Sequence, residues 1–322
     1  MKPKVCIIFT GGTISMTVDE KMGAAIPTLS GEQILSMVTN IDKIADIEVL
    51  NFAEIPGPHM TFSKLLQLKK VVQEKLDEPQ ISGVIVTHGT DTLEETAYFL
   101  DLTINHHKPI VMVGAMRSSS ELGYDGSSNL AAGVCTAISS QARDKGVLVV
   151  LNNEVNPASE VTKTNTLSLD TFSSPYGPVG IVDNNDLVLY RNIANRQYIQ
   201  TDTVEREVDL IKAVIDMDDR MIRNSVKAGA KGIVIEGLGR GNVPIKMLEG
   251  IKYALAKGVV VVIVSRCNAG RVSLSYGYEG GGRELDELGA IMGGEMRGPK
   301  ARIKLMLALG AGMSKDEIRD LF

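Results

Sequence analysis

Short apolar runs alternate along the chain with segments of helical periodicity. The first runs are rich in β-branched residues: Val5–Phe9, Gly83–Thr87, Ile110–Gly114 and Gly146–Leu151. They are apolar throughout rather than at every second position, which is typical of strands buried on both faces of a sheet. Helical spacing of apolar residues is found in Ser63–Leu76, Leu93–Leu102 and Asn129–Ile138. Strands that alternate with helices indicate parallel βαβ units covered by helices.

The pattern breaks between Tyr190 and Val208, where polar residues follow one another without an apolar period. It then resumes with three apolar runs, which we predict as strands: Leu210–Met217, Gly232–Ile235 and Gly258–Val264. Helices are expected near Ile222–Ala228, Lys246–Ala256 and Lys300–Leu309. We therefore predict an α/β protein with a larger N-terminal parallel-sheet domain (1–190), a linker (191–209) and a smaller C-terminal α/β domain (210–322).

Composition narrows the class of protein. The 322 residues correspond to about two domains at typical domain size. There are 34 basic and 39 acidic residues, a formal net charge of −5, which is a poor match for nucleic-acid or anionic-membrane binding. Hydrophobic residues make up 44% and charged residues 23%, the balance of a folded globular chain. Aromatic residues are only 4% and Gly numbers 32, so we expect aliphatic strands joined by tight turns.

Cysteines and histidines argue against disulfide and metal sites. Cys6, Cys135 and Cys267 have no C-x-x-C spacing, and Cys6 and Cys135 fit buried apolar positions. The four histidines form no spacing typical of zinc ligands. No apolar segment approaches the ~18 residues of a membrane span, and the N-terminal run is too short for a signal peptide. We expect a cytoplasmic protein without a metal site.

Three turns could carry chemistry, and each also has a simple structural interpretation. Thr10-Gly11-Gly12-Thr13 follows the first strand; it is either a glycine-rich turn or the presentation of Thr13 as a hydroxyl nucleophile. It matches neither the phosphate-binding G-K-[ST] loop nor the dinucleotide G-x-G-x-x-G turn. A nucleotide-dependent dehydrogenase is therefore the weakest interpretation.

The second turn runs from Thr87 to Thr96. Asp91 and Glu94 have the spacing of a D-x-x-E capping box at a helix start. The same segment sets a hydroxyl, Thr90, beside a carboxylate at a helix N-terminus, where an anionic group is favoured. The two interpretations are compatible.

The third segment is Glu160–Thr166, where Lys163 is flanked by hydroxyl and amide side chains. A lone Lys is by default a solvated surface charge. Brought beside Thr90, it could act instead as a base toward a hydroxyl.

Taken together, these turns resemble the bacterial-type L-asparaginase family over almost the whole chain and in the same order. The matching segments are Thr10–Ile14, Thr87–Thr92, Val113–Arg117, Val161–Thr166, Gly239–Asn242 and Pro299–Leu309. The resemblance implies a flavodoxin-like C-terminal domain and hydrolysis of the side-chain amide of L-asparagine, and possible hydrolysis of L-glutamine. It implies no cofactor.

The resemblance also implies roles for individual residues. Thr13 would attack the amide carbon, and Thr90, activated by Lys163 and supported by Asp91, would form a second threonine site. Asp91 would bind the α-amino group, and the Ala115 carbonyl would accept from the leaving nitrogen. Backbone N–H groups in the turns of Gly12 and Gly89 would hold the oxyanion.

The sequence departs from the family in its lid. Family members carry a Tyr after the T-G-G-T turn, but Ser15–Leu35 contains none, and the first Tyr of the chain is Tyr98. We hypothesise that Tyr276 or Tyr278 takes this role. In the family this C-terminal region comes from a neighbouring subunit and supplies a carboxylate, for which Glu279 matches best. A homodimer or homotetramer with shared active sites is therefore expected.

A second departure lies at Gly57-Pro58-His59, where the family has a Ser and a Gln that grip the substrate. Pro58 offers neither a hydroxyl nor an N–H, whereas His59 can hydrogen-bond and can carry positive charge. Asn242 corresponds to the family's C-terminal contact near the substrate amine. A D-amino acid or an N-substituted asparagine therefore stays open as the substrate.

Two further functions stay open. The fold could serve as an amino-acid-binding regulatory module with little turnover, although Lys163 would have no use in a pure binder. A tRNA-linked amidotransferase subunit shares this catalytic domain, but the chain has no basic RNA-binding face. The leading hypothesis is an asparaginase-like amidohydrolase that acts on a small amino acid amide.

Overall fold

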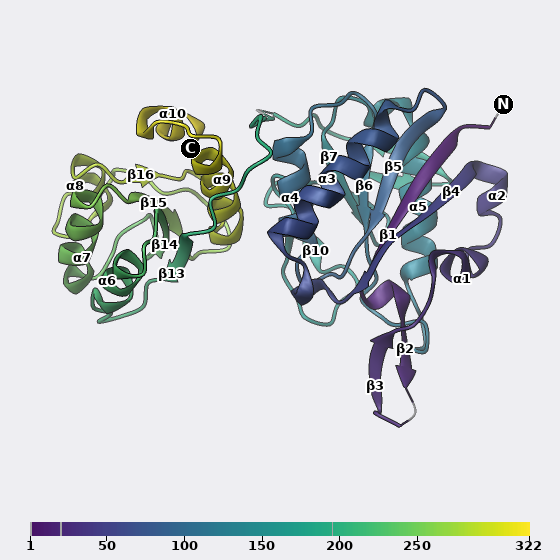
Figure 1. Ribbon diagram of the computed structural model, residues 1–322, viewed down its shortest axis with the longest axis horizontal. Coiled ribbons are helices and arrows are strands. Elements are labelled where there is room, and N and C mark those ends of the chain that lie inside the picture. The colour runs from purple at the N-terminus through teal and green to yellow at the C-terminus, as the bar shows by residue number, and fades with distance from the viewer. Residues whose placement is uncertain (1, 20, 195) are drawn as a thin grey trace. The chain divides into compact units, whose positions relative to one another are not determined.

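The chain divides into two compact units, Met1–Tyr198 and Ile199–Phe322. A computed structural model describes residues 2–19, 21–194 and 196–322 (Figure 1). Each unit is an α/β structure around its own sheet, which confirms the predicted fold class. The predicted linker, 191–209, stays a prediction.

The sheet of the first unit follows the order β12-β11-β8-β7-β6-β5-β1-β4 in the described part of the chain. Its strands are β1 (Lys4–Gly11), β4 (Asp46–Ile55), β5 (Ile81–Thr87), β6 (Ile110–Val113), β7 (Val147–Leu151), β8 (Glu154–Pro157), β11 (Gly180–Asp183) and β12 (Asp186–Leu189). From β4 to β7 all pairs are parallel, and of these strands β1, β5, β6 and β7 were predicted whereas β4 was not. β8, β11 and β12 extend the sheet in antiparallel fashion. The carboxyl ends of the parallel strands therefore share one edge of the sheet.

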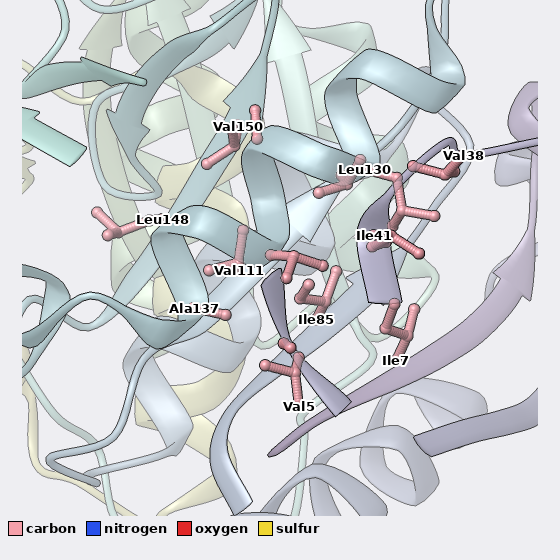
Figure 2. Packing of buried hydrophobic residues seen from close by; sticks show 14 of the residues in the cluster. Val5, Ile7, Val38, Ile41, Ile85, Val111, Leu130, Ala137, Leu148 and Val150 are labelled. Atoms are coloured by element: carbon pink, nitrogen blue, oxygen red, sulfur yellow. The ribbon is translucent and has the colours of Figure 1, made fainter. Parts of the chain in front are cut away.

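Helices cover both faces of this sheet because its central strands are apolar on both sides. The helices are α1 (Gly31–Ser36), α2 (Ile41–Ile44), α3 (Phe62–Asp77), α4 (Leu93–Thr103) and α5 (Gly126–Ile138), with one-turn helices η1 (Thr13–Ser15), η2 (Gly57–His59) and η3 (Ser140–Ala142). On one face, alternate strand residues such as Val5 and Ile7 share one hydrophobic cluster with Ile41 of α2 and Leu130 of α5 (Figure 2). α3 contacts β5 and α4 contacts β7.

The segment that the resemblance assigns to the lid forms an antiparallel hairpin, β2 (Met16–Asp19) and β3 (Ala24–Pro27) (Figure 1). A second short pair, β9 (Thr162–Lys163) and β10 (Phe172–Ser173), carries the lysine of interest. Neither pair belongs to the large sheet.

The second unit has a parallel sheet in the order β13-β14-β15-β16. Its strands are β13 (Val208–Lys212), β14 (Gly232–Gly237), β15 (Val260–Ser265) and β16 (Ile291–Met292); its helices are α6 (Arg220–Lys227), α7 (Ile245–Ala256), α8 (Gly282–Glu287), α9 (Gly298–Gly310) and α10 (Lys315–Leu321). Within the described residues, no helix is both long and apolar enough to cross a membrane.

One predicted strand is too long. We predicted Leu210–Met217, but β13 ends at Lys212. Asp216 adopts a left-handed conformation with φ of 57°, and Ile215 is 91% exposed. The apolar letters after Lys212 therefore belong to a surface turn, which hydrophobicity alone does not distinguish from a strand end.

Candidate active site

Three glycines at the ends of neighbouring strands bring the predicted site turns into contact. Gly12 follows β1, Gly57 follows β4 and Gly89 follows β5. A Cβ on Gly89 would lie 2.6 Å from the Gly57 nitrogen and 3.4 Å from the Gly12 Cα. The three backbones thus cross at a distance that leaves no room for side chains. The residues after them, Thr13, Pro58 and Thr90, consequently gather at one edge of the sheet.

The second threonine lies against a lysine from a distant part of the chain. Thr90 is buried, and the Lys163 Nζ donates hydrogen bonds to Thr90 Oγ1 at 2.9 Å and to Asp91 Oδ1 at 2.8 Å. Lys163 is not a free surface charge, because its side chain is 18% exposed and ion-paired. A hydroxyl, an ammonium and a carboxylate therefore form one cluster, which can polarise or move a proton at Thr90.

Glu94 does not cap the helix as its spacing suggested. α4 begins at Leu93 with Thr92 as the N-cap, and the cap makes no side-chain hydrogen bond. The Glu94 carboxylate instead accepts from the Lys163 backbone N–H at 2.6 Å. The capping-box interpretation is wrong because tertiary contact with β9 takes the carboxylate. Glu94 thereby fixes the strand that presents Lys163.

His88 supports the same turn through a hydrogen bond to its backbone, a role that the sequence analysis missed. It is fully buried, with Nδ1 2.9 Å from the Gly89 carbonyl oxygen and Nε2 3.0 Å from Thr96 Oγ1. Because a carbonyl only accepts, Nδ1 carries the proton and Nε2 accepts from the Thr96 hydroxyl. Burial lowers the pKa of His88 to about 4, against the raising effect of the Gly89 carbonyl. A neutral imidazole therefore orients the peptide between Gly89 and Thr90.

Thr13 begins the one-turn helix η1. Gly12 before it has φ of 86°, and its carbonyl accepts from the Ser15 N–H at 2.9 Å and the Ser15 hydroxyl at 2.8 Å. These bonds close a tight turn around Thr13. The threonine is half-buried, and its side chain makes no hydrogen bond within the described residues. Its hydroxyl is therefore available for a ligand.

Ala115 lies in the loop after β6 and is fully buried. The buried Asp125 carboxylate accepts from the backbone N–H of Met116, at 3.0 and 3.1 Å, and from that of Arg117 at 3.0 Å. Asn129 donates to the Gly114 carbonyl at 3.0 Å and to Asp125 Oδ2 at 2.9 Å. The backbone on both sides of Ala115 is thus fixed by side chains from α5 and its N-cap, which the sequence analysis did not single out.

Pro58 and His59 are both exposed in η2, directly after the crossing glycine. The backbone N–H of His59 donates to the Pro56 carbonyl at 2.9 Å, so it closes the turn and leaves the imidazole outside. Thr92 Oγ1 donates to the Gly57 carbonyl at 2.8 Å and ties this turn to that of Thr90. The imidazole is therefore the polar group that this turn offers to a ligand.

The remaining candidates belong to the second unit and lie near one another there. Asn242 Oδ1 accepts from the Gly282 N–H at 3.3 Å, and Val243 N–H donates to the Gly280 carbonyl at 2.9 Å. These bonds hold the segment that carries Tyr276, Tyr278 and Glu279, all three exposed. The two tyrosine rings are 5.5 Å apart. Asn242 and this segment are thus gathered at one corner of the second unit.

Within the described ranges, no cluster of three or more His, Cys, Asp or Glu side chains could hold a metal ion. Cys6 and Cys135 are buried free thiols, as expected from their apolar surroundings, and burial raises the pKa of both.

The fold and the site together are two α/β units, of which the first carries a threonine–lysine cluster at the carboxyl edge of its parallel strands. The family model "Asparaginase, N-terminal" matches residues 4–195, and the model "Glutaminase/Asparaginase C-terminal domain" matches residues 207–322. The chain therefore belongs to the asparaginase family, which confirms the resemblance seen in its turns.

Individual relatives are similar over nine-tenths or more of their length. The chain is 36% identical to an L-asparaginase of Bacillus licheniformis, with 100% of this chain and 99% of that protein covered. It is 34% identical to L-asparaginase 2 of Escherichia coli strain K12, with 99% and 92% covered. The crystal structure of a probable cytoplasmic L-asparaginase from Campylobacter jejuni superposes with a TM-score of 0.89 at 32% identity, covering 99% of each chain.

Proposed function

We propose that this protein hydrolyses the side-chain amide of L-asparagine to L-aspartate and ammonia, with Thr13 as the nucleophile. The observation that carries the proposal is the hydrogen bond from Lys163 to the Thr90 hydroxyl, beside Asp91. A binding module has no need of an ammonium directed at a buried hydroxyl. Family membership and the names of the relatives support the same reaction.

The reaction takes place in two steps. The Thr13 oxygen bonds to the amide carbon, the hydroxyl proton passes to the amide nitrogen, and the C–N bond breaks to release ammonia. Water then attacks the ester carbon, which releases aspartate and restores the hydroxyl. A threonine hydroxyl is a weak nucleophile at neutral pH and needs positioned proton acceptors. Thr90, activated by Lys163, is the second threonine that takes part in this proton transfer.

Each charged or polar group of the substrate is matched to a group of the protein that can bind it. Asp91 binds the α-ammonium group, since its carboxylate is 61% exposed and also contacts Lys163. The Ala115 carbonyl accepts from the leaving nitrogen, and backbone N–H groups in the turns of Gly12 and Gly89 hold the oxyanion. His59 binds the α-carboxylate in place of the family's Ser and Gln. For Asn242, the resemblance implies a contact to the substrate amine.

Because the lid segment has no tyrosine, we infer that the second unit of a neighbouring copy supplies one. Tyr276 or Tyr278 takes the role of the lid residue, and Glu279 adds the carboxylate that the family draws from a neighbour. All three are exposed in the described chain. The functional protein is then a homodimer or homotetramer with shared sites. Its place in the cell is the cytoplasm, where the Campylobacter jejuni relative is also placed by its name, although a Haemophilus influenzae relative is named periplasmic.

One assay tests the function. The protein is incubated with L-Asn, L-Gln, D-Asn and N-substituted asparagines, and released ammonia or amine is measured. We expect L-Asn to be hydrolysed fastest, and Thr13→Ala and Lys163→Met to lower turnover by at least about 1,000-fold. Lys145→Met is the matched control, because Lys145 bonds the Asn192 side chain and, among the described residues, no residue of the candidate site.

Wild-type turnover in both site variants would refute the mechanism. Binding of an amino acid without release of ammonia or amine would favour the regulatory module instead. If ammonia or amine is released only from D-Asn or an N-substituted asparagine, the amide hydrolysis stands but L-asparagine is not the substrate.

A further inference from the structure

One loop makes hydrogen bonds to two parts of the candidate site, the Thr13 turn and the loop of Ala115. The segment Ser118–Asp125, here called the bracing loop, contacts both the Thr13 turn and the Ala115 loop through two consecutive residues, Tyr124 and Asp125. Tyr124 donates its hydroxyl proton to the Ile14 carbonyl at 2.9 Å, a contact across 110 residues of sequence. Asp125, the next residue, holds the backbone N–H groups of Met116 and Arg117. The two groups that would flank the scissile amide therefore share one support.

The bracing loop also holds the base of the hairpin that follows Thr13. The Met16 carbonyl accepts from the Ser119 N–H at 3.1 Å and from the Ser119 hydroxyl at 2.9 Å. Ser120 Oγ accepts from the Val18 N–H at 3.0 Å. The strand β2 is thus attached at Met16 and Val18, so the bracing loop constrains the backbone on the C-terminal side of Thr13.

The Tyr124 hydroxyl is a permanent donor. Burial, together with the charge of Asp125, raises the pKa of Tyr124 well above its ordinary value, so the phenol stays protonated at neutral pH. Its ring is closely confined, because a Cβ on Gly126 would collide with the ring and the hydroxyl. The hydroxyl therefore has little freedom to leave the Ile14 carbonyl.

This bond acts on Thr13 through the backbone. η1 is only three residues long, so the Ile14 carbonyl and the Thr13 side chain belong to the same turn. Ser15 holds the Gly12 carbonyl before Thr13, and Tyr124 holds the Ile14 carbonyl after it. A β-branched side chain has few χ1 choices once its backbone is fixed. The direction of the Thr13 hydroxyl is thus determined from both sides of the turn.

We propose that Tyr124 is a positioning residue for the nucleophile, which aligns the Thr13 hydroxyl by holding the Ile14 carbonyl. The proposal rests on the proposed role of Thr13. The Tyr124 hydrogen bond orders the Thr13 turn from within the same chain. The lid segment that follows this turn has no tyrosine of its own. Alignment of this kind acts on the chemical step more than on substrate binding, because misplacement by about 1 Å can cost up to 100-fold in rate.

The test compares the full-length Tyr124→Phe variant with wild type, using L-Asn hydrolysis below the melting temperature. The ring remains and only the hydroxyl is lost. We expect kcat to fall by about 10-fold or more while KM stays within about twofold, with the pH profile of kcat unchanged. Ser119→Ala is the matched control: it also removes a hydroxyl bonded to a backbone carbonyl in the bracing loop. The Ser119 N–H still satisfies that carbonyl, so kcat should stay close to wild type.

Gly126→Ala is a second, independent variant, because its methyl group would displace the Tyr124 ring without removing the hydroxyl. We expect a similar loss of kcat, and little further loss when it is combined with Tyr124→Phe. Unchanged kcat in Tyr124→Phe, or a rise in KM alone, would overturn the proposal. A changed pH profile would also overturn it, in favour of direct proton transfer by the phenol.

Thr13→Ala is measured in parallel to separate the two hypotheses. If Thr13→Ala keeps wild-type turnover, the proposed nucleophile is wrong. If Thr13→Ala is inactive and Tyr124→Phe is fully active, only the positioning role fails.

Discussion

At the scale of single residues, His88 couples the stability of the fold to pH. The unfolded chain has a His pKa near 6.5, and burial lowers the pKa of the folded residue to about 4. The unfolded state therefore binds the proton more readily between these values. Stability from this residue is fully present above pH 6.5 and is lost as the pH falls through 4. The change amounts to about 3 kcal/mol, at about 1.4 kcal/mol per pKa unit.

We predict that the free energy of unfolding falls more steeply between pH 6.5 and pH 4 in wild type than in His88→Asn. The Asn amide can replace Nδ1 as a donor to the Gly89 carbonyl but does not titrate in this range. Urea unfolding at several pH values measures both slopes. His107→Asn, which changes an exposed histidine instead of the buried one, is the matched control. Identical slopes in wild type and His88→Asn would show that His88 titrates normally.

Residue roles differ in how far the sequence could reveal them. Thr13, Thr90, Asp91 and Lys163 stand in recognisable motifs, and the structure brings the last three into contact. Tyr124 stands in no motif, and its partner Ile14 is distant in sequence, so only the folded chain reveals the contact. Glu94 was misread because its local spacing suits a cap, whereas the stronger bond is to β9.

At the scale of elements, the parallel core was predictable and the additions to it were not. β1, β5, β6 and β7 are apolar runs buried on both faces, a pattern that sequence displays directly. β4 is half-buried and contains Glu48, Asn51 and Glu54, so its period is hidden. β8, β11 and β12 have four residues each and gain their identity from pairing at the sheet edge.

The crossing of the turns after β1, β4 and β5 leads to a prediction about glycine. Gly12 has φ of 86°, and a Cβ there would strike the backbone of Gly89. Gly177 has φ of 75°, but a Cβ there would meet nothing within 4 Å. Gly177→Ala therefore loses only the free energy of left-handed strain, about 1 kcal/mol, whereas Gly12→Ala also overpacks against the Gly89 backbone and should lose about 1–3 kcal/mol more.

Denaturant unfolding measures the two losses, and L-Asn turnover measures the effect on the site. We expect Gly177→Ala to keep turnover and Gly12→Ala to lose most of it, since the turns of Thr13 and Thr90 must separate. Equal stability losses in the two variants would mean that the crossing is loose enough to admit a methyl group.

At the scale of the whole molecule, the central question is whether one chain completes its own site. The residues proposed for the second unit, Tyr276, Tyr278 and Glu279, are exposed, and the resemblance assigns their counterparts to a neighbouring copy. If two copies share each active site, defects in different units of the two copies can compensate for one another. A copy with a damaged second unit can still be served by a partner whose second unit is intact, even when that partner has lost its own nucleophile.

We therefore predict complementation between Thr13→Ala and Glu279→Ala, each of which should have little activity alone. In a mixed dimer, the intact Thr13 of one copy meets the intact Glu279 of the other at one of the two sites. Random assembly from equal amounts, by co-refolding, should restore about a quarter of wild-type L-Asn turnover. Mixing Thr13→Ala with Lys163→Met is the control, because both changes damage the first unit and no mixed site is complete. If the Thr13→Ala and Glu279→Ala mixture stays inactive although mixed dimers form, each chain builds its site alone, and the missing lid tyrosine must be replaced from within the same copy.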